Sequence, residues 1–95
     1  MQYQEFAEVL KALGHPIRLK IVEGLLENEC CVNNIAEKLE APQSTISQHL
    51  GVLRNLGIIF PVKIGVKTCY KVKDQRAIEI IKLIRKPDEN VRKIG

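Results

Sequence analysis

The stretch PQSTISQHLGVLRNLG, residues 42–57, decides the fold of this chain. Its apolar residues Ile46, Leu50 and Leu53 recur at the spacing of one helical face. Pro42 suits the first turn of a helix, and Gly57 suits its end. The stretch therefore predicts a helix from about residue 42 to residue 55 or 56, with a buried apolar stripe and an exposed polar face.

A shorter helix precedes this one across a turn at residues 40–42. It runs from Asn33 to Leu39, and Ile35, Ala36 and Leu39 form its apolar face. Two helices of these lengths, joined by a turn of about three to four residues, form a helix-turn-helix. We therefore place a helix-turn-helix at about residues 33–56.

After Gly57 the apolar period changes from that of a helix to that of a strand. The segments 58–60 and 66–72 are typical of two strands, with Lys63-Ile64-Gly65 as the tip between them. Pro61 has no N–H for a ladder, so we expect it at an edge or a bulge. A β-hairpin, or wing, is predicted at about residues 58–72.

Two further helices are predicted before the helix-turn-helix. The first stops at Gly14, and the second opens at His15-Pro16 and ends near Asn28. A brief extended segment is expected at Cys30-Cys31-Val32. The apolar faces of the two helices contain Phe6, Val9, Leu10 and Leu13, and then Ile17, Ile21, Val22, Leu25 and Leu26.

A last helix is predicted from Asp74 to about Lys86. Ile78, Ile81 and Ile84 share one stripe, and the other flank is apolar as well. One small core cannot absorb both flanks, so we expect this helix to pack against a partner. The prediction is a mainly α fold with a β-hairpin wing, in the order α-α-β-α-α-β-β-α, forming a single domain over residues 1–95.

Length and composition exclude several classes of protein. The 95 residues allow one domain, and 45% hydrophobic with 27% charged residues is ordinary for a globular chain. No apolar run approaches the roughly 20 residues that span a bilayer, and residues 1–5 do not resemble a signal peptide. We therefore expect a cytoplasmic protein with no membrane contact. No nucleophile triad, glycine-rich phosphate loop or convincing carboxylate pair is present, so we expect no enzyme.

The charge is unevenly distributed. Residues 41–73 contain no Asp or Glu and carry five basic residues, Arg54, Lys63, Lys67, Lys71 and Lys73. A surface selected only for solubility mixes its signs. An acid-free segment that also holds neutral polar side chains predicts a face for a polyanion such as DNA.

Four pieces of the chain, in this order, resemble the ArsR/SmtB family of winged helix-turn-helix repressors over roughly residues 5–85. They are ALGHPIRL (12–19), QSTISQHL (43–50), LRNLGII (53–59) and GVKTCYKV (65–72). The resemblance implies a homodimeric, sequence-specific DNA-binding repressor that a small effector releases from its operator. Its partner would be double-stranded DNA with pseudo-palindromic half-sites about one turn apart. The alternative is a winged-helix module that binds protein without sequence-specific DNA binding.

The family pattern also implies roles for individual residues. Arg18 occupies a position where a structural role and a phosphate contact are both open. The dimer interface would use Phe6, Leu10, Ile78, Ile81 and Ile84. The DNA would be contacted by Gln43, Ser44, Thr45, Ser47, Gln48 and His49 on the recognition helix, and by Arg54, Lys63 and Lys67 at phosphate or the minor groove.

The cysteines depart from the family's metal sites. Cys31 aligns with the first cysteine of the family's familiar pair, but Asn33 takes the second position, and Arg76 stands where the terminal-helix site has a histidine. A standard zinc site is therefore not expected, and no cofactor is certain. Three readings stay open for Cys30, Cys31 and Cys69: a centre for a thiophilic ion such as As(III), Sb(III) or Cu(I), a thiol-redox switch, or buried packing residues.

Overall fold

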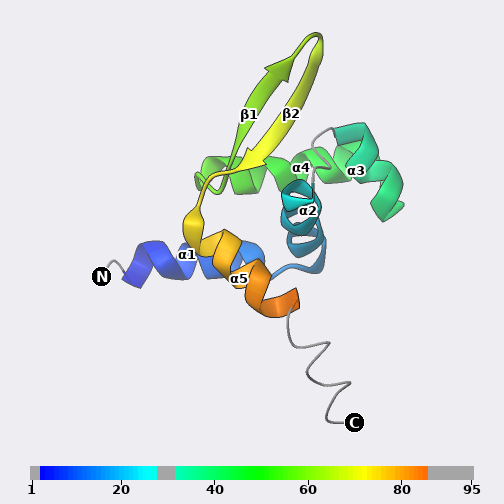
Figure 1. The fold of residues 1–95 in the computed structure, drawn as a ribbon. Helices are drawn as coiled ribbons and strands as arrows, with labels where there is room; N and C mark the ends of the chain where they lie inside the picture. The colour runs from blue at the N-terminus through cyan, green and yellow to red at the C-terminus, as the bar shows by residue number, and fades with distance from the viewer. Residues whose placement is uncertain (1–2, 28–31, 86–95) are drawn as a thin grey trace.

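The computed structural model describes residues 3–27 and 32–85 of the chain. Within these ranges the elements follow the order α-α-α-α-β-β-α (Figure 1). The predicted fold class, mainly helical with a β-hairpin wing, is confirmed. The elements are α1 (Tyr3–Leu13), α2 (Pro16–Leu26), α3 (Val32–Leu39), α4 (Gln43–Asn55), β1 (Ile59–Ile64), β2 (Lys67–Val72) and α5 (Gln75–Arg85).

The extended segment predicted at residues 30–32 is wrong at Val32, which begins α3. Cys30 and Cys31 lie outside the described residues. The first residue of a helix has no preceding turn against which a β-branched side chain would be crowded, so valine is tolerated at this end. The half-buried Val32 side chain also packs against the core from that position. The sheet of the described residues consists of β1 and β2 alone.

The hairpin is longer on its first strand than the sequence predicts, because β1 continues through Pro61 to Ile64. Pro61 lies opposite Tyr70 in the antiparallel register. In a two-stranded sheet both strands are edges, so the missing N–H of Pro61 can face outward. The turn is Gly65-Val66, and Gly65 has φ +63°. A positive φ at only the first central residue is the pattern of a type II′ turn, and the hairpin projects away from the helices (Figure 1).

The core lies around α2, which contacts each of the other helices and β2. Ile21 and Val22 of α2 are completely buried, as are Ile46 and Leu53 of α4 and Ile58 just before β1. The helix-turn-helix is therefore positioned by apolar packing, and its polar face is left outside. The remaining buried core residues are Val9, Ala12, Leu13, Leu25, Ile35, Ala36, Leu50, Ile59, Ala77 and Ile81.

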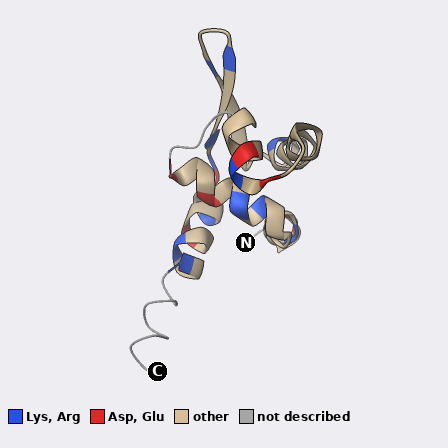
Figure 2. Ribbon diagram, turned by 90° about the vertical axis from the view of Figure 1, so that its right-hand side faces the viewer, with Lys and Arg blue, Asp and Glu red and all other residues tan. Residues whose placement is uncertain are grey.

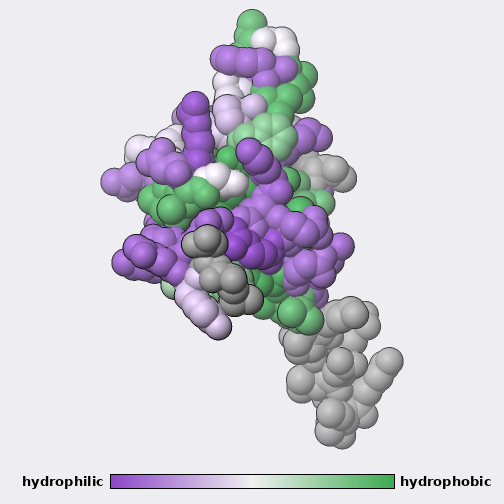
Figure 3. All heavy atoms as spheres, turned by 90° about the vertical axis from the view of Figure 1, so that its left-hand side faces the viewer, coloured by the Kyte–Doolittle hydropathy of each residue, from purple (hydrophilic) through white to green (hydrophobic). Residues whose placement is uncertain are grey.

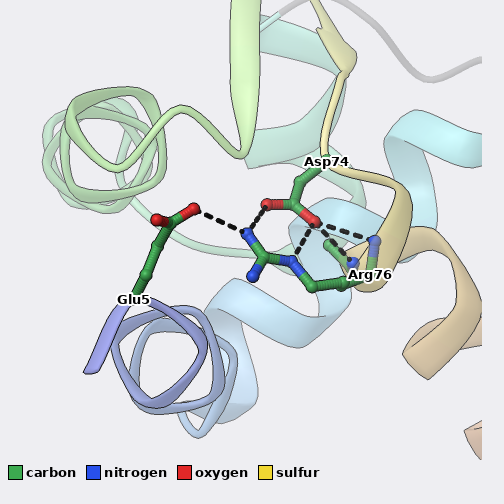
Figure 4. Close-up of polar contacts among 4 residues, drawn as sticks. Glu5, Asp74 and Arg76 are labelled. Atoms are coloured by element: carbon green, nitrogen blue, oxygen red, sulfur yellow. Dashed lines mark hydrogen bonds and ion pairs between the residues drawn. The ribbon is translucent and has the colours of Figure 1, made fainter. Parts of the chain in front are cut away.

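A polar joint links the start of α5 to α1 (Figure 4). Asp74 caps α5 by accepting hydrogen bonds from the backbone N–H groups of Arg76 (2.8 Å) and Ala77 (3.3 Å). Arg76 Nη2 also lies 3.1 Å from Asp74 Oδ2 and 3.3 Å from Glu5 Oε1, and its guanidinium carbon lies 5.7 Å from the ring centroid of Phe6. Burial raises the pKa of Asp74, but the hydrogen bonds from Arg76 and Ala77 outweigh it and leave this pKa below its ordinary value.

The described helices are too short and too polar for any of them to cross a membrane.

Candidate nucleic-acid interface

The turn between α3 and α4 is held by backbone hydrogen bonds. Glu40 adopts φ +52°, its N–H donates to Glu37 O at 3.2 Å, and the N–H of Ala41 donates to Ala36 O at 3.0 Å. These two bonds form a Schellman motif, which ends α3 and satisfies its last carbonyls. Pro42 then precedes the first residue of α4. This local geometry sets the direction in which α4 leaves the turn.

The polar face of α4 is presented to solvent as predicted. Ser44, Ser47 and Gln48 are exposed, whereas Thr45 is half-buried. Gln43 is also exposed, but its Nε2 donates to Asn33 Oδ1 at 2.6 Å. The Gln43 side chain therefore ties the start of α4 to α3, a contact that the sequence analysis did not foresee.

His49 is held against the start of α2. Arg18 Nη1 lies 3.4 Å from His49 Nδ1, and the rings of His49 and His15 are 4.5 Å apart between centroids. Burial, followed by the neighbouring His15 and Arg18, lowers the pKa of His49. Arg18 Nε also donates to Ala12 O at 2.6 Å, so this arginine connects the end of α1 to α4. The geometry gives Arg18 a structural role.

The predicted basic residues are on the surface. Arg54 is exposed in the last turn of α4, and Lys63 and Lys67 are exposed on opposite strands of the hairpin. The hairpin carries lysines but no acidic residue (Figure 2). A polar cavity of about 380 Å³ is lined by Gln43 and Lys67, among others. The fold therefore brings the N-terminal end of α4 and the second strand of the wing to one surface.

The tip of the wing is apolar, which the sequence analysis did not point out. Ile64 is 55% exposed and Val66 is 98% exposed, and Figure 3 shows hydrophobic side chains reaching the tip of the projecting hairpin. Ile64 lies opposite Lys67, and Lys63 lies opposite Thr68. Since directly opposed residues share a face of the ladder, one face of the tip carries Lys67 beside Ile64, and the other carries Lys63 beside Thr68.

Of the predicted cysteines, only Cys69 lies in the described residues. It is on β2 opposite Val62 and is 2% exposed. Cys30 and Cys31 lie outside the described ranges. Within residues 3–27 and 32–85, no group of three or more His, Cys, Asp and Glu side chains could hold a metal ion.

The predicted dimer residues occupy α1 and α5. Leu10 is 47% exposed and Ile84 is 51% exposed, and Phe6 and Ile78 are half-buried. Ile81, by contrast, is 2% exposed and attaches α5 to the core of its own chain. An open apolar groove of about 220 Å³ runs between the two helices and is lined by Phe6, Gln75, Arg76, Glu79, Ile80 and Leu83.

Comparison with known proteins places this arrangement in a family. Residues 15–59 match the model of the bacterial regulatory proteins of the arsR family. The chain is 44% identical to an uncharacterized HTH-type transcriptional regulator of Methanocaldococcus jannaschii, over 87% of this chain and 94% of that protein. It is 36% identical to the transcriptional repressor PagR of Bacillus anthracis, over 88% of this chain and 85% of that protein.

Solved structures of similar proteins have the same fold as this chain. The PagR crystal structure superposes with a TM-score of 0.80, covering 88% of this chain and 97% of that one. A homodimeric winged helix-turn-helix DNA-binding domain from Mycobacterium bovis, 22% identical, has a TM-score of 0.82 and shares the fold, over 98% of this chain and 86% of that one. The chain therefore belongs to the ArsR family of helix-turn-helix proteins, and it is a DNA-binding transcriptional repressor and not an enzyme.

Proposed function

We propose that this protein is a homodimeric repressor that binds a pseudo-palindromic DNA operator through α4 and the wing, and leaves it when an effector binds. The observation that carries the proposal is the neutral polar face of α4 beside a lysine-bearing hairpin, in a segment, 41–73, without a single acidic residue. Acidic side chains on this surface would repel the phosphates of DNA, and residues 41–73 contain none.

The two parts of this surface suit different parts of the duplex. The exposed hydroxyl and amide groups of Ser44, Ser47 and Gln48 can pair with base edges in the major groove. The exposed side chains of Arg54, Lys63 and Lys67 can neutralise phosphates, and the two lysines of the wing can also enter the minor groove. The N-terminal half of α4 would then supply sequence preference and the wing most of the general affinity. The helix would be supported at the edge of the groove by the half-buried Thr45, and by Gln43 and His49, which contact other residues of the chain.

A second copy of the chain is the proposed occupant of the apolar face on α1 and α5. Leu10, Leu83 and Ile84 are each about half exposed or more, next to the half-buried Phe6 and Ile78. The related domain from Mycobacterium bovis is described as homodimeric. A dimer on this face would present two copies of α4, as successive major grooves of a pseudo-palindrome require.

The effector would act through the wing. Cys69 is buried in β2, the strand that carries Lys67, so chemistry at its sulfur can alter the direction of the wing. We consider two sensing chemistries. One is coordination of a soft ion by Cys69 with Cys30 or Cys31, and the other is a disulfide between Cys69 and one of them. Cys69→Ser and Cys31→Ser, assayed for DNA release with arsenite, with oxidant and with reductant, separate them. Unchanged release in both variants would make the cysteines packing residues and place the sensor elsewhere.

DNA selected by the protein from a random duplex pool tests the proposal as a whole. We expect a pseudo-palindromic sequence, a dimer in solution at micromolar concentration, and a slope of log K against log salt of roughly −5 to −7, for about three to four neutralised phosphates per protomer. A monomer, or a flat salt response with no selected sequence, would contradict it. The latter result would favour a module that binds protein.

A further inference from the structure

Gly51 lies in the middle of α4, on the face that we propose to meet DNA. It follows Gln48 by three residues and Ser44 by seven, the spacings at which helical residues share one face. Ser44 and Gln48 are exposed, whereas Ile46, Leu50 and Leu53 are buried on the opposite side of the helix. The exposed polar face of α4 therefore contains one position, Gly51, that has no side chain.

The chain's own fold gives no reason for this glycine. Apart from its two chain neighbours and the adjoining backbone of α4, a Cβ built at Gly51 meets no heavy atom of the described residues within 4 Å. Its φ is also not positive, unlike that of Gly57 (+73°) and Gly65 (+63°). Gly14 differs again, because a Cβ there would lie 3.3 Å from Leu10 O. Glycine is the least favourable helix residue after proline, so Gly51 weakens α4 without serving its packing or its backbone conformation.

We propose that Gly51 is a close-approach point, where the bare backbone of α4 seats against the edges of the bases in the major groove. The Cα atoms of a helix lie on a cylinder of about 2.3 Å radius, whereas side chains extend it to about 5–6 Å. A glycine on the contact face therefore lets the groove floor come nearer to the helix axis. Side chains in helices lean toward the N-terminus, so Gln48 leans away from Gly51 and leaves the spot uncovered.

The surroundings of Gly51 fit a nucleic-acid ligand. Neither the Arg54 nor the Asn55 side chain, about one turn further along α4, places a heavy atom within 4 Å of the added Cβ. Helix α4 contains no acidic residue, and Arg54 adds positive charge in its last turn. This inference rests on the proposed function, because it takes the α4 face as the DNA-binding face.

The test is Gly51→Ala in the full chain, with stability and DNA affinity measured on the same preparations. If the position is open in the free protein, alanine raises Tm by about 4 °C or more, since it strengthens the helix, at a fixed protein concentration. If the position seats against bases, the same alanine weakens binding to the selected DNA at least about tenfold. We expect a much smaller loss on random duplex. Gly51→Leu should bind more weakly still.

Val52→Ala is the matched control, because it also favours helix formation but adds no bulk to the face of Ser44, Gln48 and Gly51. It should leave DNA affinity within about twofold of the parent. If Gly51→Ala is more stable and binds both DNAs like the parent, the inference is wrong and the proposed function stands. An equal loss on both DNAs, or a lowered Tm, also overturns it. If the parent itself selects no DNA, the proposed function fails first.

Discussion

The rings of His15 and His49 lie with their centroids 4.5 Å apart, tilted by 48°, although 33 residues separate them in the sequence. His15 Nδ1 accepts a hydrogen bond from the Ile17 N–H at 3.1 Å and so caps α2. Arg18 Nη1 can only donate, so His49 Nδ1 faces it as an acceptor. His15 therefore uses Nδ1 to cap α2, whereas His49 of α4 turns its Nδ1 toward Arg18 of α2.

This joint predicts a stability that falls in mild acid. Burial, together with His15 and Arg18, lowers the pKa of His49, so between this pKa and about 6.5 the unfolded chain binds more protons than the folded one. The free energy of unfolding should therefore rise with pH through that window and level off above it. His49→Gln should flatten the rise, as measured by Tm from about pH 5 to pH 8 at fixed protein concentration. An equally steep rise in the variant would exclude His49 as its source.

Gln48 should determine sequence preference. It is exposed on the polar face of α4, and its side chain makes no hydrogen bond with any of the described residues. Gln48→Ala should weaken binding to the selected DNA by about 1–3 kcal/mol and to random duplex much less. Fluorescence anisotropy on both duplexes measures the difference. Losses of the same size on the two duplexes would remove Gln48 from the base-reading residues.

Lys63 and Lys67 should contribute general affinity instead. Replacing both by alanine removes four charges from the proposed dimer, so the slope of log K against log salt should become shallower by about 3–4. The ratio of affinities for selected and random DNA should stay nearly constant. Lys11→Ala combined with Lys20→Ala removes the same charge at exposed positions on α1 and α2, and so controls for net charge. A slope unchanged in the double variant would show that the wing does not meet phosphate.

Asp74 should stabilise the fold near neutral pH and lose this effect in acid. Hydrogen bonds from Arg76 and Ala77 leave its pKa below the ordinary value, so its contribution is complete above the unfolded pKa of about 4 and disappears as pH falls through the folded pKa. Asp74→Ala should lower the free energy of unfolding at pH 7 by about 0.5–2 kcal/mol, as for a lost helix cap. Asp74→Asn keeps a capping oxygen but removes the negative charge. Its decrease in the free energy of unfolding should therefore be smaller, and it measures the contribution of the charge alone. In denaturant titrations, the difference in the free energy of unfolding between the parent and Asp74→Asn should be smaller at about pH 3 than at pH 7.

The apolar face of α1 and α5 should hold the dimer together. Leu10→Ser combined with Leu83→Ser should shift the protein toward monomer in sedimentation velocity, because both side chains are substantially exposed in one chain. Val66→Ser is the control, since Val66 is still more exposed but lies at the wing tip. Loss of the dimer in the control alone would place the interface on the wing.

Local patterns were enough to predict α4 and much of its surface. The period of Ile46, Leu50 and Leu53 identifies the buried stripe, and residues opposite a buried stripe on a helix are exposed wherever it packs. The hairpin followed in the same way from its change of period and from Gly65. The expected membership of the ArsR family, confirmed by the family match and the relatives, also depends on short motifs of neighbouring residues.

Contacts between distant segments depended on the tertiary structure. The stripe of Ile78, Ile81 and Ile84 did not reveal that Ile81 is buried in its own core while Ile84 remains exposed. Nor did the sequence indicate that His15 meets His49, or that Asn33 accepts from Gln43. Periodicity tells which side chains share a face, because it depends only on the geometry of one helix. Whether that face is covered depends on which other segment packs there, and this is settled only when the whole chain folds.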